Sequence, residues 1–384
     1  MNAGLYIHIP FCLKKCPYCD FYSITDTSLQ PAFMDALASE MRMTRGGTLQ
    51  FDTLYMGGGT PSVLDAKAVG RIIKTARQSY EILSDAEITL EVNPGTVTPE
   101  QLSMYRCSGV NRINIGVQSF DPDHLCFLGR IHSSRDADLA VKWAQKAGYK
   151  NIGFDLIYGI PGQTKKSWLL DLQLAVEFEP QHLSCYMLSF EQGTPLYSDR
   201  KKGRFEPLAE YRVCELFETT LEFLSDHGYV QYEISNFARE TIDKSGFKNS
   251  EVNRSRHNVK YWTFVPYIGF GPSAHSFLEP KRYWNCADVK KYIQDLEAGK
   301  LPLAGEERLS LEQLMIEAIC LGLRQIEGIA IDVFDKKFGV SFKRMFEEVV
   351  SDFEEKGLME FSQNRCAMTH RGMLYLDSIA SMFI

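Results

Sequence analysis

No apolar stretch of the 384-residue sequence approaches the roughly 18 consecutive residues that a membrane-spanning helix needs. The start of the chain lacks the basic region and long apolar core of a secretory signal peptide, because it enters a strand-like stretch at once. An excess of positive charge is also missing: the formal net charge is −7, whereas nucleic-acid-binding proteins usually carry a basic face. We therefore expect a cytoplasmic protein that does not bind nucleic acid.

Cytoplasmic proteins keep their cysteines reduced, so the ten cysteines of this sequence are expected to be thiols or metal ligands rather than disulfides. Seven of them stand singly and are predicted to be small buried hydrophobic residues: Cys107, Cys126, Cys185, Cys214, Cys286, Cys320 and Cys366.

The other three cysteines, Cys12, Cys16 and Cys19, follow a strand-like stretch in the run Cys-Leu-Lys-Lys-Cys-Pro-Tyr-Cys. Three thiolates at this spacing can bind three irons of a cubane iron–sulfur cluster and leave its last iron without a protein ligand. An iron with an open position can bind a small molecule, which makes such a site reactive. A structural zinc site is the alternative, although such sites use four ligands, usually in two spaced pairs.

The first half of the sequence alternates short apolar stretches with amphipathic ones. This pattern predicts strands over 5–9, 53–56, 87–92, 112–116, 152–157 and 182–188, and helices over 32–43, 66–80, 99–108, 134–147 and 165–178. Such alternation is typical of parallel strands joined by right-handed crossovers. Six β/α units predict an α/β fold with an open or partial barrel, since a full barrel needs two more.

The pattern changes after about residue 193. A helix over 208–227 precedes strand-like pieces at 229–235 and 259–264, and the polar stretch 237–258 is predicted to be a loop. From about residue 304, helices over 311–323, 332–338 and 342–356 and two short strands within 359–369 indicate a small winged-helix-like module. We therefore predict three domains: a partial barrel over 1–200, an α/β extension over 201–303, and the module over 304–384.

Function in such barrels gathers at the C-terminal ends of the strands. Three consecutive glycines at 57–59 follow the second predicted strand, and they allow backbone N–H groups to approach a ligand closely. Glu91 ends the third strand, where its carboxylate is a candidate partner for a ribose hydroxyl or an ammonium group. Gln118, Arg130 and Asp155 are each typical of solvated surface positions when taken singly, and it is their joint placement that indicates a site.

A histidine stands among aromatic residues in the run Arg-His-Asn-Val-Lys-Tyr-Trp at 256–262. Imidazole is a common axial ligand of haem iron, and aromatic rings pack on porphyrin faces. The residues alone favour the alternative, a histidine hydrogen-bonded in a loop beside core aromatics. A second glycine-rich turn at 269–276 either returns the chain to the mouth of the barrel or is a plain turn.

Several motifs, taken in order, resemble a known family. They are Tyr-Ile-His-Ile-Pro-Phe-Cys-x₃-Cys-Pro-Tyr-Cys, Gly-Gly-Gly-Thr-Pro-Ser, Glu-Val-Asn-Pro, Gly-Val-Gln-Ser-Phe, Leu-Gly-Arg-Ile-His and Asp-Leu-Ile-Tyr-Gly-Ile-Pro-Gly. Together they are similar to the radical S-adenosylmethionine proteins around oxygen-independent coproporphyrinogen III oxidase. The cysteine motif alone marks only the superfamily, whereas the ordered set covers nearly the whole chain and is more specific.

This resemblance implies a partial (β/α)6 radical-SAM barrel, a C-terminal α+β region and a [4Fe-4S] cluster on the three clustered cysteines. The open iron would be chelated by the amino and carboxylate groups of S-adenosylmethionine, whose cleavage yields a 5′-deoxyadenosyl radical. By motif position, the resemblance implies that this cofactor contacts Tyr6, Gly58 and Glu91. In the oxidase a second copy is held by the residues that match Tyr18, Gly59, Thr60, Gln118, Arg130 and Asp155.

Two departures separate this chain from the oxidase. Phe21 stands where the oxidase has a fourth cysteine, and only five residues precede Tyr6, where the oxidase carries an extension. Together with Arg-His-Asn-x-x-Tyr-Trp, these features look like the HemW-type haem chaperones. That resemblance implies haem binding, delivery of haem to haem-dependent respiratory proteins, and His257 as the residue that touches haem.

Two other functions remain open at this point. One is the oxidase's own reaction, the radical-driven oxidative decarboxylation of coproporphyrinogen in porphyrin biosynthesis. The other is tRNA modification, which the acidic balance and the lack of a recognisable RNA-binding module disfavour. A haem carrier that docks peripherally at a membrane is compatible with the absence of an anchor.

Overall fold

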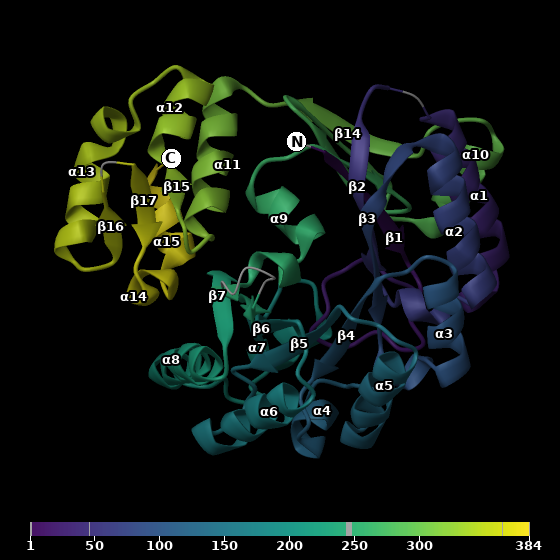
Figure 1. Ribbon diagram of the computed structural model, residues 1–384, viewed down its shortest axis with the longest axis horizontal. Helices are drawn as coiled ribbons and strands as arrows, with labels where there is room; N and C mark the ends of the chain where they lie inside the picture. Colours follow the sequence, from purple (N-terminus) through teal and green to yellow (C-terminus); the bar gives the residue numbers. More distant parts are fainter. Residues whose placement is uncertain (1, 46, 243–247, 363, 384) are drawn as a thin grey trace.

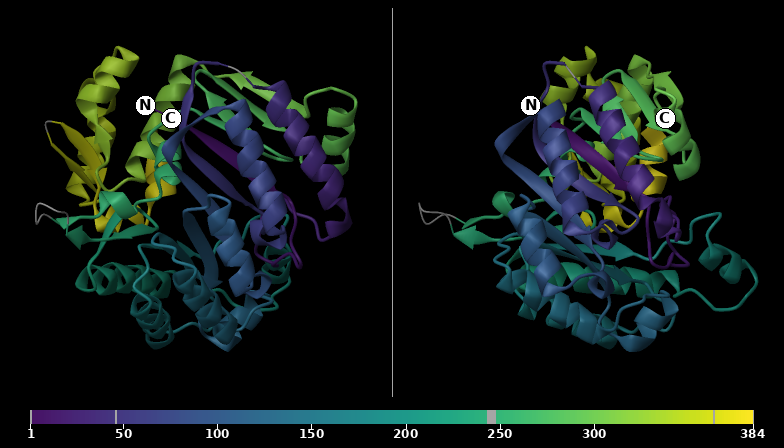
Figure 2. Two further views of the ribbon diagram at one scale, coloured as in Figure 1. Left: turned by 45° about the vertical axis from the view of Figure 1, so that its right-hand side comes forward. Right: turned by 90° about the vertical axis from the view of Figure 1, so that its right-hand side faces the viewer.

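The computed structural model describes residues 2–45, 47–242, 248–362 and 364–383. Its centre is a 12-stranded sheet in the order β14-β13-β12-β11-β1-β2-β3-β4-β5-β6-β8-β7. The helices that follow the first strands cover one side of this sheet, and the C-terminal elements gather at another side (Figures 1 and 2).

Six parallel strands form the middle of the sheet: β1 (Ala3–Ile9), β2 (Gln50–Gly58), β3 (Glu81–Val92), β4 (Arg112–Gln118), β5 (Ile152–Tyr158) and β6 (His182–Met187). The helices between them are α1 (Gln30–Met43), α2 (Ala66–Ser79), α3 (Pro99–Cys107), α5 (Ser134–Lys146) and α6 (Lys165–Glu177). The prediction of a partial barrel of six β/α units is therefore confirmed. Two further helices, α4 (Pro122–Phe127) and α7 (Pro195–Lys201), are too short for the helical period to reveal them.

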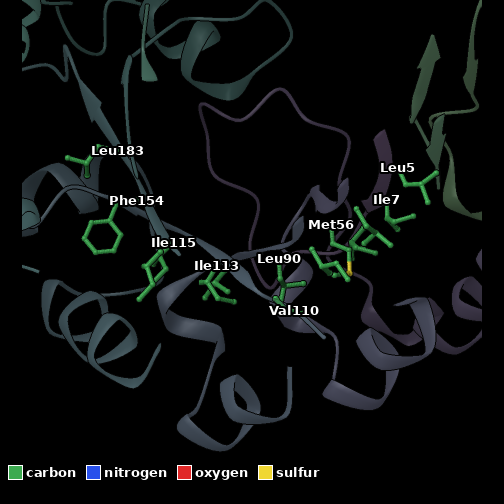
Figure 3. Close-up of a cluster of buried hydrophobic side chains, with 14 of the residues drawn as sticks. Leu5, Ile7, Met56, Leu90, Val110, Ile113, Ile115, Phe154 and Leu183 are labelled. Carbon is green, nitrogen blue, oxygen red and sulfur yellow. The ribbon is translucent and has the colours of Figure 1, made fainter. Parts of the chain in front are cut away.

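Alternation along the parallel strands separates the core from the functional face. Leu5 and Ile7 of β1, Leu90 of β3 and Phe154 of β5 belong to one buried apolar cluster beneath the helices (Figure 3). The residues between them, such as Tyr6, Glu91 and Asp155, therefore face the opposite side of the sheet. Burial of this apolar face thus fixes which polar side chains look into the barrel.

The second half of the chain extends the same sheet at both edges. On one edge, β8 (Asn236–Arg239) pairs antiparallel with β6, and β7 (Tyr229–Glu233) pairs with β8; α8 (Glu210–Asp226) precedes them. On the other edge, β11 (Tyr267–Phe270) runs parallel to β1 and is followed by three antiparallel strands and a helix: β12 (His275–Leu278), β13 (Lys281–Asn285), β14 (Leu303–Arg308) and α10 (Val289–Glu297). The sequence pattern predicts none of the strands β11–β14. The division of the chain at 200 and 303 stays a prediction.

The predicted strand-like piece at 259–264 is wrong, because this segment lies mostly in helix α9 (Arg256–Trp262). Val259 and Tyr261 alternate with polar residues as in a strand, but the Ser255 hydroxyl accepts the backbone N–H of Asn258 and begins a helix. The predicted loop over 237–258 is also wrong at both ends, since it contains most of β8 and the start of α9. It further contains the short pair β9 (Thr241–Ile242) and β10 (Lys248–Asn249), and residues 243–247 lie outside the described residues.

The C-terminal part confirms the predicted helices and strands. It contains α11 (Leu311–Leu323), α12 (Ile331–Phe338), α13 (Phe342–Glu355), and a three-stranded sheet of β15 (Ile329–Ala330), β17 (Arg365–Met368) and β16 (Met359–Phe361), followed by α14 (His370–Met373) and α15 (Leu376–Ala380). Arg324 forms a 2.8 Å ion pair with the buried Glu233 of β7 and thereby ties this part to the large sheet.

Burial corrects the prediction for the single cysteines in part. Cys185, Cys286 and Cys366 are buried, and Cys214 and Cys320 are partly buried, whereas Cys107 and Cys126 are exposed on helices α3 and α4. Burial of a single cysteine is a tendency and not a rule, so a cysteine on a helix can also face solvent. Within the described residues, we find no helix that is long and apolar enough to cross a membrane.

The turn between β11 and β12 requires glycine at position 271. Gly271 has a φ of +95°, and a Cβ there would collide with the backbone oxygen of His8. Its N–H donates to Glu40 at 3.0 Å, and its carbonyl accepts from Asn285 at 2.9 Å. The turn is therefore pressed against β1 and held on both sides.

We predict that Gly271→Ala lowers the free energy of unfolding by about 3 kcal/mol or more, because a strained φ and a backbone collision act together. The matched control is Gly299→Ala, where φ is +72° but nothing lies within 4 Å of the added Cβ, so that only the φ cost of about 1–2 kcal/mol applies. Denaturant unfolding of both variants measures the difference. Equal losses would show that the close approach to β1 contributes nothing.

Candidate functional site

A cavity of about 970 Å³ opens at the C-terminal ends of the parallel strands. This volume lies at the upper end of the roughly 300–1,000 Å³ that hold a single drug-sized ligand, so there is room for more than one group. All residues that the motifs suggest for the cofactor line it: Tyr6, Tyr18, Gly58, Gly59, Thr60, Glu91, Gln118, Arg130 and Asp155. Residues spread over 150 positions of sequence thus meet because parallel strands end at one edge.

The three clustered cysteines lie beside this cavity. Cys12 is buried and its sulfur accepts the Thr60 hydroxyl at 3.4 Å. The Cys16 sulfur accepts an Arg130 N–H at 3.5 Å, and Cys19 lines the cavity itself. These two donors hold the Cys12 and Cys16 sulfurs in fixed positions beside the cavity.

The donor set suits a cubane better than a single ion. Among the described residues, no group of three or more His, Cys, Asp or Glu side chains is arranged to hold one metal ion. A cubane needs no such convergence, because each of its three cysteine ligands binds a different iron. The residues present therefore fit a [4Fe-4S] cluster, in which Cys12, Cys16 and Cys19 would each hold one iron.

Glu91 is one of the acidic residues that line the cavity. Its Oε1 accepts the Tyr55 hydroxyl at 2.7 Å, and burial raises the pKa of Glu91 to about 7, although that hydrogen bond lowers it. A buried carboxylate with lone pairs to spare binds ammonium or hydroxyl groups strongly when it is ionised. Asp155 resembles it: burial raises its pKa, and Asn114 donates to it at 2.7 Å.

Close approach of backbones shapes the wall between β1 and β2. Gly58 has a φ of +104°, and a Cβ there would lie 2.5 Å from the His8 ring. The His8 ring is itself held by the Tyr22 carbonyl at 2.8 Å and by the Tyr6 hydroxyl at 3.1 Å. A glycine at 58 is therefore needed to bring the chain against His8 and leave the cavity open.

Sequence reasoning missed several residues of the wall. Tyr55 and Asn114 hold the two cavity carboxylates, and Tyr186, Met187 and His275 also line the cavity. Strand alternation could have found Tyr55 and Asn114, because each stands between two fully buried apolar residues of its strand. The glycine-rich stretch at 269–276 does return the chain to the mouth of the barrel, because its Ser273 and His275 line the cavity. The strand that carries His275 was not predicted.

The structure does not bring His257 into the cavity lining. The residue is only 1% exposed. Its Nδ1 lies 2.8 Å from the Thr53 hydroxyl, and its Nε2 lies 2.9 Å from the Tyr261 hydroxyl. The ring stacks on Tyr55, with centroids 5.2 Å apart. His257 thus supports the cavity wall from behind, and both of its nitrogens are engaged. Its role as a haem ligand stays a prediction.

Comparison with known proteins identifies the family of this chain. The model of the Radical SAM superfamily matches residues 6–175, and that of the HemN C-terminal domain matches residues 309–375. "Heme chaperone HemW" of Bacillus subtilis is 34% identical to this chain over 99% of it and 98% of the relative. The protein of the same name from Escherichia coli is 38% identical, again over 99% of this chain and 98% of the relative. The chain belongs to the HemW family.

This HemW-family chain shares its fold with a solved enzyme. The structure of coproporphyrinogen III oxidase (HemN) from Escherichia coli covers 100% of this chain and 90% of its own, with a TM-score of 0.83 and 23% identity. That likeness establishes the radical-SAM fold and, at this identity, the fold alone. It agrees with the six parallel strands and with the C-terminal elements described above.

In this HemW-family chain, apolar side chains rim the mouth of the cavity. Phe21 is 66% exposed, and Met187 at the end of β6 is 55% exposed. Both line the cavity, together with Tyr186. Exposed apolar groups around an opening are typical of sites that accept an apolar ligand or partner.

Proposed function

We propose that the protein is a haem chaperone that binds haem beside an iron–sulfur cluster and S-adenosylmethionine and delivers haem to haem-dependent proteins. The observation that carries this proposal is the similarity over essentially the full chain to relatives named heme chaperones. Respiratory haem proteins are the proposed acceptors, and the cytoplasm, with its reducing conditions, is the proposed compartment.

Three groups of residues would divide the work in this proposal. Cys12, Cys16 and Cys19 would hold the cluster, and Tyr6, Gly58 and Glu91 would hold S-adenosylmethionine. When bound, such a cluster would supply an electron and an iron with an open coordination position, which the amino and carboxylate groups of the cofactor would chelate. Gln118, Arg130 and Asp155 lie in the same cavity, and Arg130 is fixed by a 2.8 Å bond to the Gly116 carbonyl. Their ligand, a second cofactor molecule or another group, stays a proposal.

The cavity's composition supports a planar, largely apolar ligand with charged edges. Phe21, Tyr186 and Met187 offer apolar contact at the mouth, and Tyr261 and Tyr267 offer ring faces and hydroxyls. Porphyrins combine a wide apolar face with two propionates, so aromatic side chains bearing a polar end suit them. The volume beyond what one cofactor fills leaves room for such a ligand.

We predict that the anaerobically reconstituted protein binds haem saturably at one site and passes it to an apo-haem protein. Absorption titration measures the binding, and recovery of the acceptor's spectrum measures the transfer. With coproporphyrinogen, S-adenosylmethionine and a reductant, we expect no porphyrinogen turnover above the cluster-free protein. Substantial turnover would favour the oxidase function instead, and lack of saturable haem binding would refute the chaperone function.

A further inference from the structure

Among the histidines of the described residues, His8 and His275 line the cavity. Both nitrogens of the His8 ring are engaged, as described above, and the residue is buried. The His275 side chain is exposed to the cavity, and no hydrogen bond to its ring is found in the described part of the chain. His275 therefore presents the one cavity imidazole of these two whose nitrogens are available.

The His275 ring is directed by a rigid support. It is the first residue of β12 and follows the turn in which Gly271 is held by Glu40 and Asn285. Across the strand pair it faces Trp284, whose ring stacks on it with centroids 5.8 Å apart and planes at 21°. A side chain fixed by a braced turn and a stacked neighbour pays little entropy on binding a ligand.

The chemistry around this ring suits coordination to iron. Burial first, and Arg282 second, lower the pKa of His275 below its ordinary value, so the ring is neutral at pH 7 and keeps a lone pair. Tyr267 and Tyr261, which pack edge to face with centroids 4.6 Å apart, line the same cavity and provide aromatic surface for a flat ligand. Neutral imidazole is a frequent protein ligand of haem iron.

We propose that His275 is the axial ligand of haem iron in this protein. This assignment rests on the proposed haem binding and adds to it the atom that holds the iron. In this arrangement His257 is a positioning residue: it bonds to Tyr261, which lines the cavity, and its own ring remains behind the wall.

Three alanine variants test the assignment: His275→Ala, His257→Ala, and His370→Ala as a control at an exposed position outside the cavity lining. Each reconstituted protein is titrated with haem, and the axial ligand is read by absorption and electron paramagnetic resonance spectroscopy. We expect His275→Ala to lose the imidazole signature, to weaken haem binding tenfold or more, and to regain the signature with added imidazole. His257→Ala and His370→Ala keep the signature.

His275→Ala should retain its cluster and its unfolding midpoint, because the exposed ring makes no hydrogen bond within the described structure. A wild-type signature and affinity in His275→Ala would overturn the assignment, as would loss of the signature in His257→Ala alone. Absence of haem binding by the wild-type protein would refute the proposed function itself. That failure is distinguishable, because it is seen before any variant is made.

Discussion

Cys16→Ser is expected to abolish the iron–sulfur cluster. The Cys16 sulfur accepts an N–H from Arg130, whose other terminal nitrogen is anchored to the Gly116 carbonyl, so the sulfur is held in a fixed position. Serine offers a harder oxygen ligand with a much higher pKa, and two remaining thiolates are a poor set for a cubane. Iron and acid-labile sulfide per chain should fall to near zero, and the brown absorbance should disappear.

Cys107→Ser is the matched control for this experiment. Cys107 lies exposed at the end of α3 and does not line the cavity, so its replacement should leave iron and sulfide unchanged. An intact cluster spectrum in Cys16→Ser would show that the ligands are wrongly assigned. Stoichiometric zinc without sulfide in the oxygen-free wild-type protein would favour the structural zinc alternative.

Glu91→Gln is expected to lower the affinity for S-adenosylmethionine tenfold or more. A charge-assisted hydrogen bond from a buried carboxylate contributes about 1.5–3 kcal/mol, and the isosteric amide keeps the shape while losing the charge. The amide oxygen can still accept the Tyr55 hydroxyl, so the wall should stay in place. Equilibrium binding measured by calorimetry or dialysis under anaerobic conditions gives the effect.

Glu91→Gln should also remove the pH dependence of S-adenosylmethionine binding. Because the pKa of Glu91 is raised to about 7, its carboxyl is neutral below that pH and ionised above it. Binding of a cationic ligand to the ionised form should therefore strengthen as the pH rises through about 7 in the wild-type protein, and this rise should be absent in Glu91→Gln. Glu87→Gln is the control, since Glu87 has the same parity on β3 but lies outside the cavity lining. Equal affinity and an equal pH profile in Glu91→Gln would refute its cofactor role.

The parallel strands and their helices could be predicted because their signals are local. Each strand is an apolar run between turn residues, and helices such as α3 and α5 begin at capping boxes on Thr98 and Ser133. The strands β12–β14 were missed for a physical reason. They are short, and β14 is largely exposed on both faces, so no alternation of apolar and polar residues marks it. They form because β11 can pair with the free edge of β1, and the strands that follow then pair with β11 in turn.

The candidate site also has features that the sequence could predict and features that it could not. Glu91, Gln118 and Asp155 could be suspected because strand ends converge in any parallel barrel, whatever their distance in sequence. Alternation also marks Tyr55 and Asn114 as facing the cavity, but the carboxylate that each one holds could not be predicted, because the two members of each pair come from different strands. Tyr55 reaches Glu91 from β2, and Asn114 reaches Asp155 from β4.

Spacing along the chain is enough to predict the cluster motif, the six β/α units and the glycines at 57–59, because each of these signals is local. Which histidine presents available ring nitrogens to the cavity is set by contacts between distant segments. His257 is hydrogen-bonded to Thr53, which is 204 positions away in sequence, and its ring lies behind the cavity wall. His275 reaches the cavity on β12, a strand that the sequence pattern did not predict. The direction of a side chain depends on what packs around it, and that environment is assembled from distant parts of the chain.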